Sequence, residues 1–212
     1  MNTRSARLLA ALCTALLALG CTTGDGWGRV HSKQLYIEEC WNGPLELEPD
    51  FFAAVPFEED AMFIRVQRGD DQEGVSDGLM ILINDLQDVR RNQIGTAIPV
   101  GLPPGVSPPG VPIVQNPDPP KVSFTLYLHD SCEARTADLY SVRGTITFKS
   151  LFSGDMNEHD GSDRLTDATF QAWFADPRKA APDGSYATGL ESEVNGWFRF
   201  FFQRGQPAQP FL

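Results

Sequence analysis

Alternation of apolar and polar residues with a period of two recurs along the chain, and this pattern predicts β-strands. The clearest case is 122–129 (VSFTLYLH), in which every second residue is apolar. The segment 142–149 (VRGTITFK) has the same pattern, with a glycine at one of the inward positions. No apolar stripe with the 3.6-residue period of a helix persists. The chain is therefore expected to form antiparallel sheet with one face covered and the other wet.

Further segments extend this set of predicted strands: 34–40, 61–68, 79–83, 166–175 and 194–203. The segment 79–83 (LMILI) is apolar throughout, which is typical of a central strand. In 194–203, Trp197, Arg199 and Phe201 lie opposite the phenylalanine side, so we expect both faces of this strand to be covered. The pattern predicts an all-β fold, an antiparallel β-sandwich of about 7–9 strands.

A proline-rich segment interrupts the strands at 99–120 (PVGLPPGVSPPGVPIVQNPDPP). It holds nine of the chain's 16 prolines. Proline removes a backbone donor and fixes φ, so a central strand is not expected here. We predict a long loop within one domain. A linker between two domains and a ligand for an aromatic-lined groove remain as alternatives. The segment 85–91 (DLQDVRR) is expected to form a helical turn.

Composition supports a folded chain and excludes one class of partner. The chain has 212 residues, and its hydrophobic fraction of 42% is ordinary for a globular protein. Its 28 acidic and 17 basic residues give a formal net charge of −11. Nucleic-acid binding needs a basic surface, so no nucleic-acid partner is expected.

The first 21 residues (MNTRSARLLAALCTALLALGC) have the organisation of an export signal. Arg4 and Arg7 precede an uncharged stretch, 8–20, that is too short to cross a bilayer. The stretch ends in Leu-Ala-Leu-Gly immediately before Cys21. This ending resembles the lipobox of bacterial lipoproteins, although Ala18 stands where leucine is usual. An ordinary signal peptide with a chance cysteine is the alternative.

The resemblance implies a specific modification and location. Residues 1–20 would be removed, and Cys21 would carry a diacylglycerol thioether and an acylated amine, palmitate among its fatty acids. Two or three chains hold a protein firmly at a membrane, whereas one does so only marginally. Thr22 stands where aspartate retains enterobacterial lipoproteins in the inner membrane, which implies the outer membrane. The chain would then comprise a tether (21–29), one β domain (30–206) and a tail (207–212).

The remaining cysteines predict a disulfide. Of the chain's four cysteines, Cys13 would leave with the signal and Cys21 would carry lipid. Cys40 and Cys132 are then left in an oxidising compartment, where they are expected to pair. They lack the CxxC partners that a zinc site would require.

Candidate catalytic chemistry is sparse. His129 precedes Asp130 and Ser131, but neighbouring residues on a strand point to opposite faces, so these three cannot form a catalytic triad. The chain also lacks a G-x-S-x-G motif. We expect no enzymatic activity. Convergence of His159 with several carboxylates in a cleft would favour the alternative of an envelope hydrolase.

An acidic segment at 153–167 offers oxygen ligands of the kind that calcium prefers. Its candidate ligands are Asp155, Asn157, Asp160 and Asp163. Their spacing departs from the calcium-loop pattern, so a solvated acidic loop is the simpler interpretation. A second acidic segment, 69–78, would strengthen the calcium hypothesis if the two converged in space.

Together these observations predict a membrane-anchored lipoprotein of the cell envelope whose β-sandwich does non-enzymatic structural or binding work. Its expected contacts are the membrane, through the lipid, and an envelope protein. A calcium-stabilised adhesion or partner-binding module is the main alternative. No cofactor is expected apart from the covalent lipid.

Overall fold

The computed structural model describes residues 26–69, 73–107, 119–132 and 138–203. Ten strands make up most of this part of the chain: β1 (Gly26–Ile37), β2 (Trp41–Leu47), β3 (Phe51–Phe57), β4 (Ala61–Gly69), β5 (Ser76–Asn84), β6 (Ile98–Gly101), β7 (Val122–Leu128), β8 (Asp138–Ser150), β9 (Leu165–Ala175) and β10 (Ser192–Phe201). The helical segments are short: η1 (Glu73–Val75), α2 (Leu86–Asp88), η2 (Val89–Gln93) and η3 (Pro177–Lys179). None of the described helices has the length and apolar character needed to traverse a lipid bilayer.

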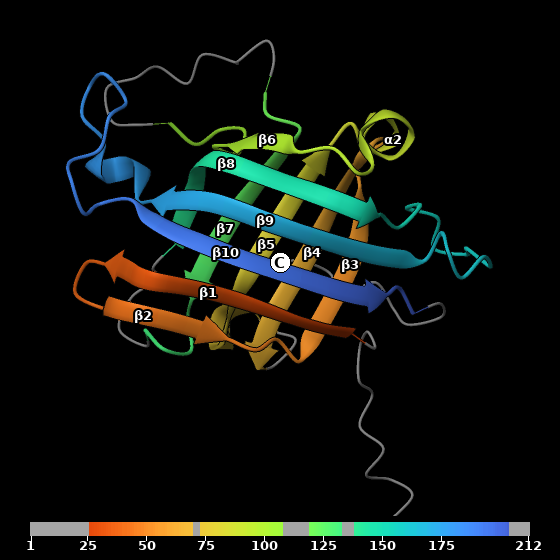
Figure 1. Ribbon diagram of the computed structural model, residues 1–212, viewed down its shortest axis with the longest axis horizontal. Coiled ribbons are helices and arrows are strands. Elements are labelled where there is room, and N and C mark those ends of the chain that lie inside the picture. Colours follow the sequence, from red (N-terminus) through yellow and green to blue (C-terminus); the bar gives the residue numbers. More distant parts are fainter. Residues whose placement is uncertain (1–25, 70–72, 108–118, 133–137, 204–212) are drawn as a thin grey trace, which may run out of the picture.

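All ten strands belong to one continuous sheet, in the order β2-β1-β10-β9-β8-β6-β7-β5-β4-β3. Every pairing is antiparallel except the one between β6 and β7. The sheet curls, so that β1, β10, β9 and β8 lie in front of β7, β5, β4 and β3 and cross them steeply (Figure 1). The all-β prediction is confirmed. The two layers are halves of a single mixed sheet, whereas the prediction was of an antiparallel sandwich.

The core lies between these two layers and is rich in phenylalanine. Phe124 of β7 contacts Phe170 and Phe174 of β9, with ring centroids 5.0 and 6.0 Å apart. Phe52 of β3 stacks on Phe200 of β10 at 5.6 Å. Each contact joins the back layer to the front layer, so burial of these rings holds the curled sheet closed.

Several predicted strands are confirmed. The segments 122–129 and 142–149 fall in β7 and β8, and 79–83 falls in β5, which lies between β4 and β7 inside the sheet. The helical turn expected at 85–91 is also present, as α2 and η2.

The first strand is longer than its hydrophobic pattern predicted. β1 begins at Gly26 instead of residue 34, and Gly26 pairs with Phe200. The expected tether therefore extends no further than residue 25. The sequence did not predict this part of β1 because glycine has a low strand propensity. At position 26, however, the packing requires a glycine. A Cβ atom at Gly26 would lie 2.4 Å from the Phe200 Cβ.

Two edge strands and one internal strand were missed. The segments 41–47 and 51–57, which lie outside the predicted strands, form β2 and β3, and these two strands are the edges of the sheet. Pro44 and Pro56 are tolerated there because an edge strand has one side without a partner strand.

The proline-rich segment also contributes to the sheet, contrary to the expectation of a loop from residue 99. Its first residues belong to β6, which is inserted between β7 and β8. β7 and β8 pair directly at Thr125 and Tyr140, and β6 fills the space where they separate. Pro99 fits because β6 makes only two residue pairings with each neighbour. Residues 108–118 of the predicted loop lie outside the described part of the chain.

Candidate functional site

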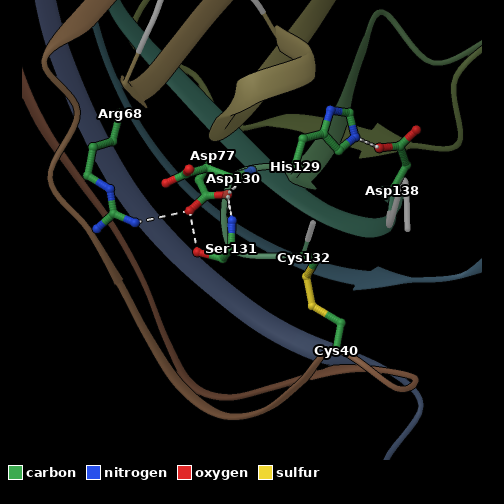
Figure 2. Close-up of a disulfide and its surroundings, with 8 residues drawn as sticks. All are labelled: Cys40, Arg68, Asp77, His129, Asp130, Ser131, Cys132 and Asp138. Carbon is green, nitrogen blue, oxygen red and sulfur yellow. Dashed lines mark hydrogen bonds and ion pairs between the residues drawn. A yellow bond between two sulfur atoms is a disulfide. The ribbon is translucent and has the colours of Figure 1, made fainter. Parts of the chain in front are cut away.

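A disulfide joins the two layers at one end of the sheet. Cys40 lies in the turn between β1 and β2, and Cys132 lies in the turn that follows β7 (Figure 2). Their Cα atoms are 5.7 Å apart, within the usual range for a disulfide, which agrees with the predicted pairing. Because β1 is in the front layer and β7 in the back layer, the bridge links both layers covalently.

Asp77 on β5 is buried beside this bridge, with only 1% of its surface exposed. Its carboxylate accepts hydrogen bonds from the backbone N–H groups of Asp130 (3.2 Å) and Ser131 (3.0 Å) and from the Ser131 hydroxyl (2.6 Å). The Arg68 guanidinium donates a fourth, at 3.0 Å. A buried carboxylate is stable only when it is paired in this way. Asp77 therefore fixes the turn that leads into Cys132 (Figure 2).

His129 is held by two oxygen acceptors. Its Nδ1 lies 3.0 Å from the carbonyl oxygen of Glu73, and its Nε2 lies 2.9 Å from Oδ1 of Asp138. Asp138 is the first residue of β8, so this pair connects the end of β7 to the start of β8.

Further buried polar groups lie beside His129. The Tyr127 hydroxyl donates to Oε1 of Gln67 at 2.6 Å, and Gln67 donates to the Ser76 hydroxyl at 3.1 Å. Burial raises the pKa of Tyr127 well above its ordinary value, so this phenol stays neutral and remains a donor. The Arg65 guanidinium is also buried and lies 3.6 Å from the Glu73 carboxylate.

This arrangement does not support acyl-transfer chemistry. The Ser131 hydroxyl donates to Asp77, while His129 is engaged by Asp138 (Figure 2). The other ring nitrogen of His129 is engaged by the carbonyl oxygen of Glu73. Asp77 already accepts four hydrogen bonds, from the turn and from Arg68. Nucleophilic catalysis needs a hydroxyl held by a free base. The geometry instead suits a structural role, in which side chains from four strands anchor the disulfide-bearing turn.

The proposed calcium ligands make local contacts of their own. Asp155 accepts from the backbone N–H of Asn157, and Asp160 accepts from both the N–H and the hydroxyl of Ser162. The bonds from Ser162 lower the pKa of Asp160 below its ordinary value. Asp163 instead forms an ion pair with Arg90 at 2.9 Å. Across the residues that the structure describes, no cluster of three or more His, Cys, Asp and Glu side chains could hold a metal ion.

The two acidic segments lie at opposite ends of β8. Asp77 is paired with Leu128 of β7, and the preceding residue of β7, Tyr127, is paired with Asp138 at the start of β8. Asp167 is paired with Ser150 at the end of β8. The twelve residue steps from 138 to 150 span about 40 Å at ~3.3 Å each. The convergence that would have strengthened the calcium hypothesis is therefore absent.

The remaining histidines are dispersed. His31 lies on β1 opposite Asn195, and His159 lies in the segment between β8 and β9. His129 lies at the far end of β8 from His159, so the described histidines do not gather around one site.

The face of β1 and β10 that points away from the core is exposed, which corrects the expectation that both faces of β10 are covered. Trp197 and Phe201 of β10 are 40% and 36% exposed, and Trp27 of β1 is 55% exposed. Cys21, the predicted lipid-bearing residue, lies outside the described residues. The described chain begins five positions after it, at Gly26.

Comparison with protein-family models, with curated proteins and with solved structures finds no match for this chain.

Proposed function

We propose that this chain is a bacterial lipoprotein, held at the outer membrane by lipid on Cys21, whose body does non-enzymatic structural or binding work in the cell envelope. The observation that carries the proposal is the apolar run 8–20, preceded by Arg4 and Arg7, that ends directly before Cys21. Thr22, in place of aspartate, favours the outer membrane as the destination.

The start of the fold supports a membrane-proximal anchor. β1 begins at Gly26, so residues 22–25 connect it to Cys21. Five Cα–Cα steps reach at most about 18 Å. A lipid on Cys21 would therefore keep the body directly beside the bilayer, where a protein that acts in the envelope has its partners.

The pairing of Cys40 with Cys132 supports export. Structural disulfides persist in oxidising compartments and are rare in the cytosol, where thiols are kept reduced. An exported body outside the cytoplasm agrees with a signal that ends at Cys21.

The hydrogen bonds that already engage the buried polar groups beside the disulfide support a non-enzymatic role. Ser131 and His129 are each engaged by other partners, so these two residues do not pair as a nucleophile and its base. The two crossing layers of the sheet (Figure 1) favour a sandwich-like body that displays its loops and outer faces.

Substitution of Cys21 tests the proposal in the full chain expressed in a Gram-negative host. Cys21→Ala should abolish labelling by radioactive palmitate and move the protein out of the membrane pellet or leave it unprocessed. Cys13→Ala is the matched control, because Cys13 also lies in the N-terminal segment but would be removed with it; this variant should be labelled like the parent.

Mass spectrometry of the mature protein gives the decisive result. The expected polypeptide begins at Cys21 and carries the mass of a diacylglycerol and a fatty acid on that residue. Continued palmitate labelling of Cys21→Ala, or a mature chain with an unmodified Cys21, would refute the proposal.

A further inference from the structure

Three aromatic side chains gather on the outer face of β1 and β10, next to the point where the described chain begins. Among the described residues, the exposed large hydrophobic side chains are Trp27, Phe57, Val75, Ile94, Trp197 and Phe201. Trp27, Trp197 and Phe201 are the three that share this face, and we refer to them as the aromatic patch. On the opposite face of β10, Phe198 and Phe200 are fully buried, so the patch is separate from the core.

Strand register places the members of the patch close together. Trp27 is paired directly with Arg199, which lies between Trp197 and Phe201 on the same face of β10. Trp27 is therefore the diagonal neighbour of both aromatic residues, at a spacing of about 7–8 Å that large rings can bridge. On the other side, Phe201 is paired with Leu165 of β9, which extends the apolar surface.

We infer that the aromatic patch is a membrane-contact surface that lies in the zwitterionic headgroup layer of the bilayer to which Cys21 is anchored. This inference rests on the lipid anchor proposed above. Tryptophan is enriched at membrane–water interfaces, where its ring is partly apolar and its N–H stays hydrated. An exposed tryptophan pair beside an arginine has this interfacial character, because the arginine stem is apolar and its head group is polar.

The short connection between Cys21 and the first described strand favours lipid as the partner that covers the aromatic patch. Trp27 is the second described residue, and only residues 22–25 separate Cys21 from Gly26. With Cys21 held in the headgroup layer, an extended linker allows a separation of at most about 18 Å. The lipid therefore holds this face near the surface at high effective concentration, so a weak contact suffices.

The charges around the patch favour zwitterionic over anionic lipid. Arg29 pairs with Glu46 at 2.9 Å, and Arg199 and Lys149 both lie near Asp167, at 3.5 and 3.9 Å. Each of these cations thus lies beside a carboxylate. At the same end of the sheet, the segment between β8 and β9 exposes further carboxylates, among them Asp155 and Asp160. Anionic headgroups would be repelled by these side chains.

Tryptophan quenching in vesicles tests the inference. The full-length lipidated protein is reconstituted into vesicles of phosphatidylcholine and phosphatidylethanolamine, with brominated acyl chains on part of the phosphatidylcholine. Bromine quenches tryptophans that touch the lipid. Two of the chain's four tryptophans, Trp27 and Trp197, lie in the patch. Tryptophan fluorescence should therefore be quenched in the parent, and Trp27→Phe with Trp197→Phe should abolish most of that quenching.

Trp173 provides the matched control. It lies on β9 under the guanidinium of Arg143, which is 4.0 Å from the ring centroid, and it is paired with Glu193 near the other end of β10. Trp173→Phe should leave the quenching by brominated lipid unchanged. Thermal melts of each variant show whether the fold is retained, and phenylalanine preserves the apolar character of each position.

Flotation of the same vesicles separates the two proposals. A protein that fails to float lacks the Cys21 anchor, which overturns the proposed function and this inference with it. A protein that floats but shows no quenching in the parent, or equal quenching in the double variant, overturns the inference alone. Coverage of the patch by a second copy, by another protein or by residues 204–212 would give that unquenched result.

Discussion

Replacing Asp77 with alanine should destabilise the protein more than the removal of either side chain that donates to it. The substitution removes the acceptor of four hydrogen bonds at a position that is 1% exposed. Two of the donors are backbone N–H groups of the turn that leads into Cys132, and these would lose their partner. Breaking one side of a buried charged network costs about 3–5 kcal/mol.

The individual contacts should contribute unequally. The Arg68 side chain is 46% exposed, and ion pairs in contact with solvent contribute about 0–1 kcal/mol, so Arg68→Ala should have a small effect. Ser131→Ala removes one short bond to a charged acceptor, which should cost about 1.5–3 kcal/mol. Asp77→Asn keeps an oxygen for the backbone donors and should therefore be less damaging than Asp77→Ala.

Urea unfolding of the oxidised protein, followed by circular dichroism, measures each free energy of unfolding. The combined variant Asp77→Ala with Ser131→Ala should cost less than the sum of the two single changes, because they share one hydrogen bond. A loss below about 1 kcal/mol for Asp77→Ala would refute the reasoning. If Arg68→Ala lowered the free energy of unfolding as much as Asp77→Ala, Asp77 would stabilise the protein through its ion pair with Arg68 and not through the turn.

Three further measurements address other parts of the molecule. Replacing Cys40 and Cys132 with serine opens a link between residues 92 apart, which should lower the free energy of unfolding by about 4–5 kcal/mol; an unchanged urea midpoint would contradict this. Hydrogen bonds from Lys121, and from two neighbouring amides, lower the pKa of Asp88 from 3.8 to about 2. Its contribution to stability should be fully present above pH 3.8 and fade as the pH falls through about 2, and in a carboxyl titration by NMR Lys121→Met should raise the pKa of Asp88 towards 3.8. Calcium followed by EDTA should leave the Tm unchanged, whereas a calcium-dependent rise would indicate a metal site in 153–167.

The strands that the sequence predicted best are those whose alternation is complete. In β7 every second residue from Val122 to Leu128 is apolar, and burial of that face is the physical cause of the pattern. The other face of β7 is buried as well, contrary to the expectation that it would be wet. The start of β1 and the whole of β2 were not predicted, because they contain residues of poor strand propensity. Gly26 is needed for close approach to β10, and Pro44 is tolerated at an edge.

The candidate site was less accessible to sequence reasoning. Asp77 lies in a segment that resembles a solvated acidic loop, and its partners are 53 and 54 positions away along the chain. His129 precedes Asp130 and Ser131, but its partner is Asp138. Such partners are set by the pairing of β5, β7 and β8. The cysteine pairing was predictable because elimination left two candidates. The aromatic patch was predictable only in part, because alternation cannot show which face of a strand stays uncovered.

The pairing of β1 with β10 has a consequence for biosynthesis. The first described strand lies between β2 and the last described strand, so the sheet is complete only when residues 192–201 are available to pair. Pairings between distant segments have a high contact order and form slowly. In the proposed export, one side of β1 would therefore stay without a partner strand, while β2 pairs with the other side, until the end of translocation supplies β10. Loss of β10 by premature termination would divide the sheet between β1 and β9, and no shorter product would be expected to fold.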